Sequence, residues 1–239
     1  MIELHDLAKY YGPTAAVEGL TLKITRGEIF GFIGPNGAGK TTTIQMIGGL
    51  IAPTRGRVVI DGIDMAKDPE KAKRKIGLIP DRPYLYDKLT GLEFLKFTAD
   101  VFGVDPAAFE YKAHRLLDLF SLTHRKHELI ESYSHGMKQR LIMAGALIHD
   151  PLVMIVDEPM VGLDPKGIKM VKKLFSNLSE TGTTIFMSTH TLPLAEDICN
   201  RIGIIHRGKL IASGTIEELK ENIQIQQADL EAVFFRYTG

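Results

Sequence analysis

A glycine-rich loop that directly follows a short apolar run constrains this chain more than any other feature of its sequence. The run Glu28–Gly34 is almost entirely apolar, as expected for a strand that is buried on both faces of a parallel sheet. The segment Gly34-Pro35-Asn36-Gly37-Ala38-Gly39-Lys40-Thr41 follows it and matches the P-loop pattern, between a strand and a helix-forming run. A tight glycine turn with a chance lysine would explain the loop alone, but not its context. The sequence therefore predicts a phosphate-binding site.

Each residue type in this loop has a chemical reason. Glycines let successive backbone N–H groups point at phosphate oxygens, and the helix that begins near Lys40 adds its positive end. Lys40 supplies a charge to the β- and γ-phosphates, and Thr41 offers a hydroxyl to Mg²⁺. The nucleotide-binding residues predicted here are Gly34, Pro35, Asn36, Gly37, Ala38, Gly39, Lys40, Thr41 and Thr42.

A pair of carboxylates ends a second apolar run. Leu152–Val156 is followed by Asp157 and Glu158. An acidic pair often closes a strand at the surface without further function. Parallel strands, however, end together at one edge of a sheet, which would bring this pair close to the P-loop. We therefore expect Asp157 to hold Mg²⁺ and Glu158 to orient the attacking water.

The remaining apolar patterns predict an α/β fold. Alternating residues at 2–4 and 20–24 indicate an N-terminal antiparallel β layer, and Thr183–Met187 is a further buried strand. From about residue 90 to 148 the pattern is helical, with Phe109, Ala113, Leu116, Leu117 and Phe120 as a packing face. A helix over 194–199, a hairpin across Arg207-Gly208-Lys209 and a helix over 216–221 complete the expected fold. The fold class is a P-loop NTPase core with a parallel sheet, the antiparallel layer and an inserted α-helical subdomain.

Charge and cysteine content exclude several classes of protein. Lysine and arginine number 29, as do aspartate and glutamate, so the formal net charge is zero. Proteins whose whole surface binds nucleic acid carry a basic excess, so we expect no nucleic-acid partner. The single cysteine, Cys199, excludes an intramolecular disulfide and fits a reducing compartment. Without a basic leader or an apolar run of ~18 residues, we expect a cytoplasmic chain that does not itself cross a membrane.

Three further motifs complete the pattern of a family. Tyr133–Arg140 reads Tyr-Ser-His-Gly-Met-Lys-Gln-Arg, Gly162–Pro165 reads Gly-Leu-Asp-Pro, and Ser188-Thr189-His190 ends the last core strand. With the P-loop and the acidic pair, they make nearly the whole chain resemble the ATP-binding subunit of ATP-binding cassette (ABC) transporters. By that resemblance, the three motifs are the signature motif, the D-loop and the switch histidine.

The resemblance implies a role for each motif. Tyr11 would stack on adenine, although alone it could merely pack beside Tyr10. His190 would contact the γ-phosphate, although a lone histidine is more often structural. Glu158 would position the attacking water and Lys40 would stabilise the transferred charge. The predicted nucleotide-binding residues also include Ser134, Gly136 and Asp164. By the resemblance, the signature residues Ser134 and Gly136 would contact ATP that is bound to the opposite subunit.

The resemblance also implies an organisation. One ABC domain would span 1–239, with the β layer and RecA-like core at 1–83 and 150–239 and the helical subdomain at 84–149. Its partners would be a second ATP-binding subunit, in a homodimer or heterodimer, and a transmembrane permease subunit. The chain would then lie peripherally on the inner face of the cell membrane.

One aromatic segment is the expected contact with the permease. Arg82–Leu89 would form part of the groove that receives a coupling helix, although loops rich in Tyr and Leu are usually half-packed on their own domain. Together with Pro80-Asp81 and the closing segment Leu230–Gly239, it resembles the exporter branch whose membrane subunits are of the ABC-2 type.

Two positions depart from the family pattern. Asp81 stands where a glutamine usually touches Mg²⁺, and we expect it still to sense the metal, the alternative being a solvated turn residue. His135 replaces the first glycine of the signature, where it either adds a pH-dependent phosphate contact or turns outward. Met137 replaces the usual glutamine.

Two other functions stay open. A soluble ABC ATPase could act on ribosomes or DNA, although such relatives usually carry two cassettes, a long coiled-coil insertion or basic extensions. A degenerate cassette could bind ATP without hydrolysing it, as the regulatory half of a heterodimer. Lys40, Ser134, Glu158 and His190 favour hydrolysis, and we expect an ATPase that powers transport, with ATP and Mg²⁺ as cofactors.

Overall fold

Two sheets share a core in the computed structural model, which describes residues 1–81, 84–223 and 229–238. The larger sheet has six strands in the order β10-β9-β3-β8-β7-β6, and the smaller has four in the order β2-β1-β4-β5. In the larger sheet β9, β3, β8, β7 and β6 are parallel, and only β10 runs antiparallel. The predicted α/β fold class is therefore confirmed. The strands are β1 (Ile2–Tyr11), β2 (Thr14–Ile24), β3 (Ile29–Ile33), β4 (Arg55–Ile60), β5 (Ile63–Asp64), β6 (Ile76–Ile79), β7 (Val153–Asp157), β8 (Thr184–Thr189), β9 (Arg201–His206) and β10 (Lys209–Gly214).

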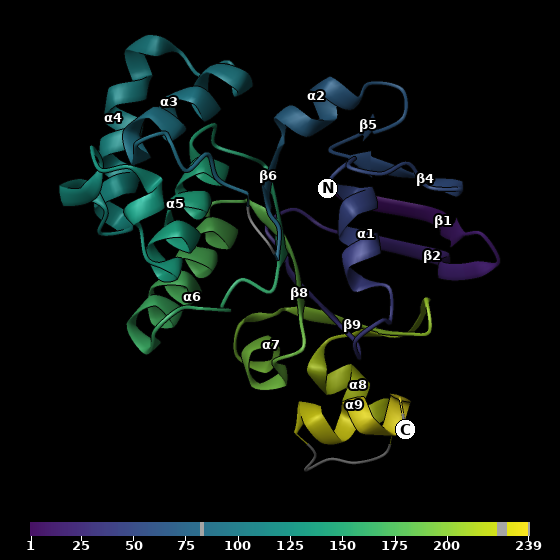
Figure 1. The fold of residues 1–239 in the computed structure, drawn as a ribbon. Helices are drawn as coiled ribbons and strands as arrows, with labels where there is room; N and C mark the ends of the chain where they lie inside the picture. The colour runs from purple at the N-terminus through teal and green to yellow at the C-terminus, as the bar shows by residue number, and fades with distance from the viewer. Residues whose placement is uncertain (82–83, 224–228, 239) are drawn as a thin grey trace.

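Helices cover the larger sheet and extend from its edge at β6 (Figure 1). The helices α3, α4 and α5 lie between β6 and β7 in the sequence, where the helical pattern predicts them. In the part of the chain that the structure describes, none of the helices is both long and apolar enough to cross a membrane. The helices are α1 (Lys40–Ile47), α2 (Pro69–Arg74), α3 (Gly91–Phe102), α4 (Pro106–Leu119), α5 (His135–Leu147), α6 (Pro165–Glu180), α7 (Leu192–Ile198), α8 (Ile216–Asn222) and α9 (Leu230–Thr238), with short 3-10 turns at Thr123–Arg125 and Ile130–Ser132.

Burial on both faces explains the apolar central strands. Every residue of β3, β7 and β8 is buried. Met154 and Val156 point toward α4, α5 and α6, whereas Val153 and Ile155 point toward α1 and the smaller sheet. Successive side chains of a strand alternate between faces, so a strand with helices on one side and a second sheet on the other can carry few polar residues.

The antiparallel layer is larger than the sequence predicts. β1 and β2 pair as expected, but β4 joins β1 on its other side and β5 follows. The start of β4, Arg55-Gly56-Arg57, is exposed and shows no alternation of apolar and polar residues. Gly56 has φ +85°, and a Cβ there would lie 2.4 Å from the carbonyl oxygens of His5 and Asp6. Close pairing with a strand far away in the sequence, and not a local pattern, therefore determines this strand.

Parallel register brings the carboxyl ends of three strands together. Ile33 of β3 is the partner of Thr189 of β8, and Asp157 of β7 is the partner of Ser188. The P-loop leaves β3 at the same edge and leads into α1. This edge therefore gathers the P-loop, the acidic pair and the segment around His190, as the rule for open parallel sheets predicts.

Candidate functional site

One cavity of about 360 Å³ collects most of the predicted site residues. We call it the P-loop pocket. Its size lies within the usual range for small-molecule sites, about 300–1,000 Å³. Ala16 and Val161, which the sequence does not indicate, complete its walls. The lining residues are Ala16, Asn36, Gly37, Gly39, Lys40, Thr41, Thr42, Asp81, Asp157, Glu158, Val161 and His190.

The glycines of the loop are required by its shape. A Cβ at Gly34 would lie 2.4 Å from the carbonyl oxygen of Ile205, so the loop can pass β9 only without a side chain. Gly39 has φ +109°, and a Cβ there would lie 2.4 Å from the carbonyl oxygen of Ala16. Gly37 has φ +78° with open space around it, so this position faces a cavity that a ligand can enter.

Lys40 is a buried cation at the base of the pocket, with 8% of its surface exposed. Its Nζ donates hydrogen bonds to the carbonyl oxygens of Gly34 (2.8 Å) and Pro35 (3.2 Å). Burial lowers the pKa of the Lys40 amine, and the nearby charges of Glu158 and Asp157 oppose that shift. A cation that is held among backbone carbonyls can exchange them for phosphate oxygens at little cost in desolvation.

Two hydroxyl groups hold the carboxylate of Asp157 in the P-loop pocket. Its Oδ2 accepts a hydrogen bond of 3.0 Å from the Thr41 hydroxyl, and its Oδ1 accepts one from the Ser188 hydroxyl. Asp157 is 3% exposed, and Asp81 lines the same pocket. The described residues contain no cluster of three or more His, Cys, Asp or Glu that could hold a metal. Mg²⁺ usually keeps several water ligands and binds only one or two carboxylates together with substrate phosphates. The hydroxyl and the carboxylates of this pocket fit such an ion, because they leave most of its coordination positions to phosphate and water.

Glu158 lies in a strained and firmly fixed position. Its φ is +51°, in the left-handed region that costs a non-glycine residue about 1–2 kcal/mol. Its N–H donates to the carbonyl oxygen of Ser188 at 3.1 Å. The Oε1 atom accepts from the backbone N–H of His190 (3.0 Å) and lies 2.6 Å from His190 Nδ1, so Nδ1 carries a proton in this contact. The Oε2 atom accepts from the Thr189 hydroxyl at 3.2 Å.

Two hydroxyls that the sequence analysis did not select hold the two carboxylates. Ser188 and Thr189 are consecutive residues at the end of β8, and they donate to Asp157 and Glu158, consecutive residues at the end of β7. Their signal in the sequence is a pair of hydroxyl residues directly before His190. Within a buried strand, such residues look like ordinary β-formers.

Seven predicted nucleotide-binding residues do not line the pocket: Gly34, Pro35 and Ala38 belong to the loop itself, and four others lie outside it. Tyr11 ends β1 and is 51% exposed, with Lys9 Nζ 5.4 Å from its ring centre. Ser134 caps α5 by accepting from the N–H of Met137 (3.3 Å), and Gly136 lies in the first turn of that helix. Asp164 caps α6 by accepting from the N–H of Gly167 (2.9 Å). Their predicted contacts with nucleotide stay predictions.

His135 packs against the segment that follows Glu158. A Cβ at Gly162 would lie 2.2 Å from Cδ2 of the His135 ring, and Gly162 has φ +80°. A Cβ at Gly136 would lie 3.4 Å from the Gly162 carbonyl oxygen. The start of α5 therefore rests on the loop between Glu158 and α6, and the imidazole faces that loop.

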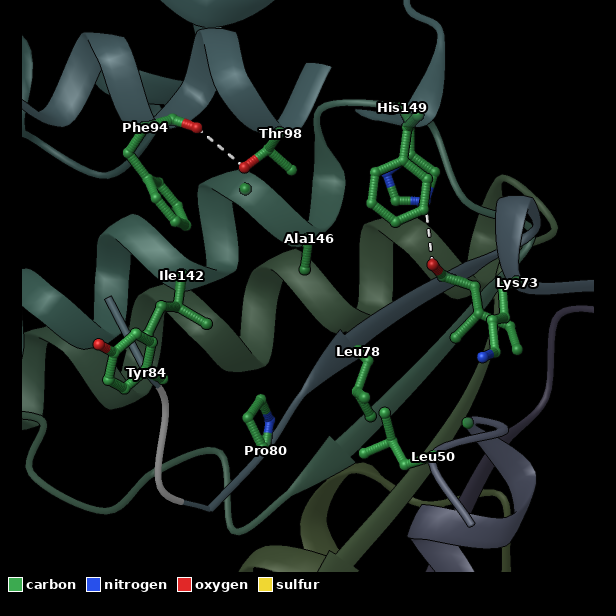
Figure 2. A pocket seen from close by; sticks show the side chains of 14 residues that line it. Leu50, Lys73, Leu78, Pro80, Tyr84, Phe94, Thr98, Ile142, Ala146 and His149 are labelled. Carbon is green, nitrogen blue, oxygen red and sulfur yellow. Dashed lines mark hydrogen bonds between the residues drawn. The ribbon is translucent and has the colours of Figure 1, made fainter. Parts of the chain in front are cut away.

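A second cavity, of about 320 Å³, has a different character. We call it the β6 groove, and Figure 2 shows Tyr84 and His149 at opposite ends of the view with Ile142 and Ala146 of α5 between them. Gly145 lets α5 approach α3, because a Cβ there would lie 2.9 Å from the Phe94 ring. The lining residues are mainly apolar: Gly48, Leu50, Lys73, Ile76, Leu78, Pro80, Tyr84, Phe94, Thr98, Phe102, Ile142, Gly145, Ala146 and His149.

The two polar groups drawn with hydrogen bonds in this groove are engaged within the chain. The Thr98 hydroxyl donates to the carbonyl oxygen of Phe94 (2.8 Å), and His149 Nε2 lies 3.0 Å from the carbonyl oxygen of Ile76 (Figure 2). The imidazole of His149 stacks on Phe102, with ring centres 3.8 Å apart. Burial lowers the pKa of His149. The groove therefore offers an apolar surface.

The aromatic segment predicted at 82–89 borders this groove. Arg82 and Pro83 lie outside the described residues. Tyr84 is 83% exposed and makes an edge-to-face contact with Tyr86, which makes another with Phe97 of α3. Leu85 is buried. The segment is thus half-packed on α3, with Tyr84 presented to solvent at one end of the groove.

Comparisons of sequence show which family this chain belongs to. The family model described as "ABC transporter" matches residues 17–161. The linearmycin resistance ATP-binding protein LnrL of Bacillus subtilis is 39% identical over 219 residues, covering 92% of this chain and 70% of that protein. The bacitracin transport ATP-binding protein BcrA of Bacillus licheniformis is 40% identical over 222 residues, covering 92% and 72%.

Solved structures give the same result. A structure described as the ATP-binding subunit of an ABC transporter superposes with a TM-score of 0.96 at 35% identity, covering all of both chains. The dimeric cassette MJ0796, in a post-hydrolysis state with ADP and Pi, has a TM-score of 0.83 at 28% identity, covering 90% of this chain and 99% of that one.

Proposed function

This chain belongs to the ABC transporter family, as an ATP-binding subunit with ATPase activity, and from that premise we propose that it hydrolyses ATP to power export through a separate membrane subunit. One observation carries the proposal: Lys40, Thr41, Asp157, Glu158 and His190 line a single pocket. The two relatives named above serve linearmycin resistance and bacitracin transport, which supports export.

Phosphoryl transfer depends mainly on positioning and on charge stabilisation. We assign to Lys40 the role of stabilising the negative charge that develops on the γ-phosphate. Its ammonium group would leave the carbonyl oxygens of Gly34 and Pro35 and bind phosphate oxygens instead. The P-loop N–H groups and the start of α1 bind the other phosphate oxygens. Tyr11 stacks on adenine.

Glu158 orients the attacking water in this proposal. Its Oε1 already has two contacts with His190, whereas Oε2 accepts one hydrogen bond within the described chain, from Thr189. Oε2 is therefore the oxygen with a free lone pair to accept the proton of water. The Nδ1–H group of His190, which contacts Glu158 in this structure, would turn toward the γ-phosphate.

Thr41 and Asp157 are the residues that would hold Mg²⁺, with Asp81 as a further oxygen donor at the pocket. A bound Mg²⁺ would neutralise part of the negative charge on the phosphates. The Ser188 hydroxyl fixes the Asp157 carboxylate for that purpose.

A second ATP-binding subunit completes the site. Ser134, Gly136 and Asp164 lie at the starts of α5 and α6 and do not line the P-loop pocket of their own chain. Unpaired N–H groups at a helix start favour an anion. We propose that they act on nucleotide bound to a partner subunit, and the dimeric state of MJ0796 supports this arrangement.

The permease subunit would dock at the β6 groove. The groove is apolar, it lies between the core strand β6 and the helices α3 and α5, and Tyr84 extends beside it (Figure 2). A segment seated there would hold the helical part and the core in one relative position. The chain would then lie on the inner face of the membrane without entering it.

Turnover of the wild-type chain tests the proposal. ATP hydrolysis is measured with and without Mg²⁺, first alone, then with the co-purified membrane partner, and then with ribosomes or DNA. We expect Mg²⁺-dependent turnover that the membrane partner raises. Stimulation by ribosomes or DNA alone would assign the chain to the soluble ATPases, and absence of turnover under all conditions would make it a regulatory cassette.

A further inference from the structure

A third cavity has a volume of about 680 Å³, nearly twice that of the P-loop pocket, about 360 Å³. We call it the α4–α6 groove, because α4, α6 and the end of α5 form its walls. None of its lining residues also lines the P-loop pocket or the β6 groove. The family motifs do not contribute to it.

Its floor is an apolar stripe of α6. Val171 and Phe175 are fully buried against the sheet. Met170, Leu174 and Leu178 follow one another at intervals of four residues beside that face, and each is only partly buried. Residues four apart in a helix lie above one another. The apolar face of α6 is therefore wider than the sheet can cover.

The opposite wall is also aliphatic. Leu116 and Leu119 of α4 and Leu147 of α5 face the groove, and Leu119 is 43% exposed. Together the two walls form a channel for an apolar body.

Cations border this channel. Arg26 and Lys173 line it and form no ion pair with any carboxylate in the described residues. Arg115 lines it as well, and its Nη2 reaches Asp150 only at 3.9 Å. Asp150 is the single acidic residue among the lining residues, and Lys112 already pairs with it at 2.5 Å. The border of the groove therefore has a surplus of positive charge in a chain whose net charge is zero.

We propose that the α4–α6 groove binds a small anionic amphiphile, with an unbranched apolar chain along Met170, Leu174 and Leu178 and a carboxylate at the cations of its border. A cavity of this volume fits a ligand of drug size. An apolar body gains from leaving water, and a single anionic head gains from Lys173, Arg115 and Arg26. A neutral or cationic head would lose that second contribution.

Binding is measured by calorimetry with dodecanoate, below its micelle concentration. We expect saturable binding of one dodecanoate per chain, and binding at least tenfold weaker for dodecyltrimethylammonium, which has the same chain and the opposite charge. Raised ionic strength weakens dodecanoate binding, because salt screens exposed charges.

The methionine methyl groups locate the ligand. The chain has nine methionines, few enough for the methyl signals to be followed in a spectrum of ¹³C-methyl-methionine protein. The Met170 signal, assigned with Met170→Leu, is the one expected to shift on titration. Lys173→Glu should weaken binding roughly tenfold. Lys67→Glu, an equal change of charge at an exposed lysine outside this groove, is the matched control and should leave affinity unchanged.

Each contrary outcome overturns the proposal. Binding that appears only above the micelle concentration, or only on anionic vesicles, would indicate general surface attraction. Equal losses for Lys173→Glu and Lys67→Glu, or shifts of other methionines without Met170, would place the ligand elsewhere. Because no step requires ATP, these results are independent of whether the chain hydrolyses nucleotide.

Discussion

The P-loop pocket and the β6 groove have similar volumes, about 360 and 320 Å³, and opposite chemistry. Charged and hydroxyl side chains line much of the pocket, and most of them form hydrogen bonds. The groove is walled by aliphatic and aromatic side chains from α3, α5 and β6, and its engaged polar groups bond to the backbone of the same chain. The lining of the first cavity suits a charged ligand, and in our proposal the membrane subunit covers the second.

The two cavities place different demands on the sequence. A reaction requires particular polar groups at fixed positions, so the P-loop pocket depends on residues that cannot be exchanged. A docking surface requires shape and apolar area, which many residues supply. Substitutions should therefore act on turnover in the pocket and on association in the groove.

The largest effect is expected at the buried cation of the pocket. Lys40→Ala removes the charge that, in our proposal, stabilises the γ-phosphate, and we expect ATP turnover to fall by about 10³-fold. The measurement is steady-state hydrolysis, with Lys67→Ala as an exposed lysine control. Turnover within a factor of ten of the wild type would remove Lys40 from the reaction.

A smaller loss is expected when a positioning hydroxyl is removed. Thr189→Val deletes the hydrogen bond to Glu158 Oε2 and keeps the side-chain shape, so kcat should fall roughly tenfold with KM for ATP little changed. Thr189→Ser retains a hydroxyl and should restore most of the rate. If valine and serine behave alike, the hydroxyl does not position Glu158.

The groove should respond through stability and pH. Burial lowers the pKa of His149 below its ordinary value of 6.5. At a pH between the lowered pKa of the folded chain and the ordinary pKa of the unfolded chain, the unfolded chain binds more protons. The free energy of unfolding therefore falls as the pH drops through 6.5. Denaturant unfolding at pH 7.5 and 5.5 should show a larger loss for the wild type than for His149→Gln. Equal losses would contradict this role.

The smallest effect on the isolated chain is expected at the exposed end of the groove. Tyr84→Ala should change the free energy of unfolding by no more than about 0.5 kcal/mol and leave basal hydrolysis unchanged. It should nevertheless weaken co-purification with the membrane partner. Tyr111→Ala, at a tyrosine of α4 that is 71% exposed and outside the groove, is the control. Equal recovery of the partner with both variants would separate Tyr84 from docking.

The central fold could be predicted from sequence because its causes are local. Buried central strands are almost wholly apolar, and the P-loop fixes the strand before it and the helix after it. The strands β4 and β5 could not be predicted, because Arg55-Gly56-Arg57 joins β1 through pairing between distant segments. The sequence likewise does not predict the helix α9 (Leu230–Thr238).

The sequence predicts ten of the twelve residues that line the P-loop pocket, whereas of the β6 groove it indicates only Pro80 and Tyr84. Lys40, Asp157 and Glu158 have residue types that only their chemistry explains. Ser188 and Thr189 were missed because hydroxyls are common in strands. Leu174 and Phe94 lie on apolar stripes of helices, and such stripes normally indicate internal packing. A stripe that is only partly buried has the same sequence pattern as one that is fully buried.

Glu158 is the residue that we propose to position the water that attacks ATP. Glu158→Gln keeps the size of the side chain and removes its charge, and it is compared with Glu110→Gln, an exposed glutamate outside the pocket. Hydrolysis and ATP-dependent dimer formation are measured together. We expect Glu158→Gln to bind ATP, to lose turnover by at least 10²-fold and to accumulate as an ATP-bound dimer. Turnover equal to that of Glu110→Gln would contradict it.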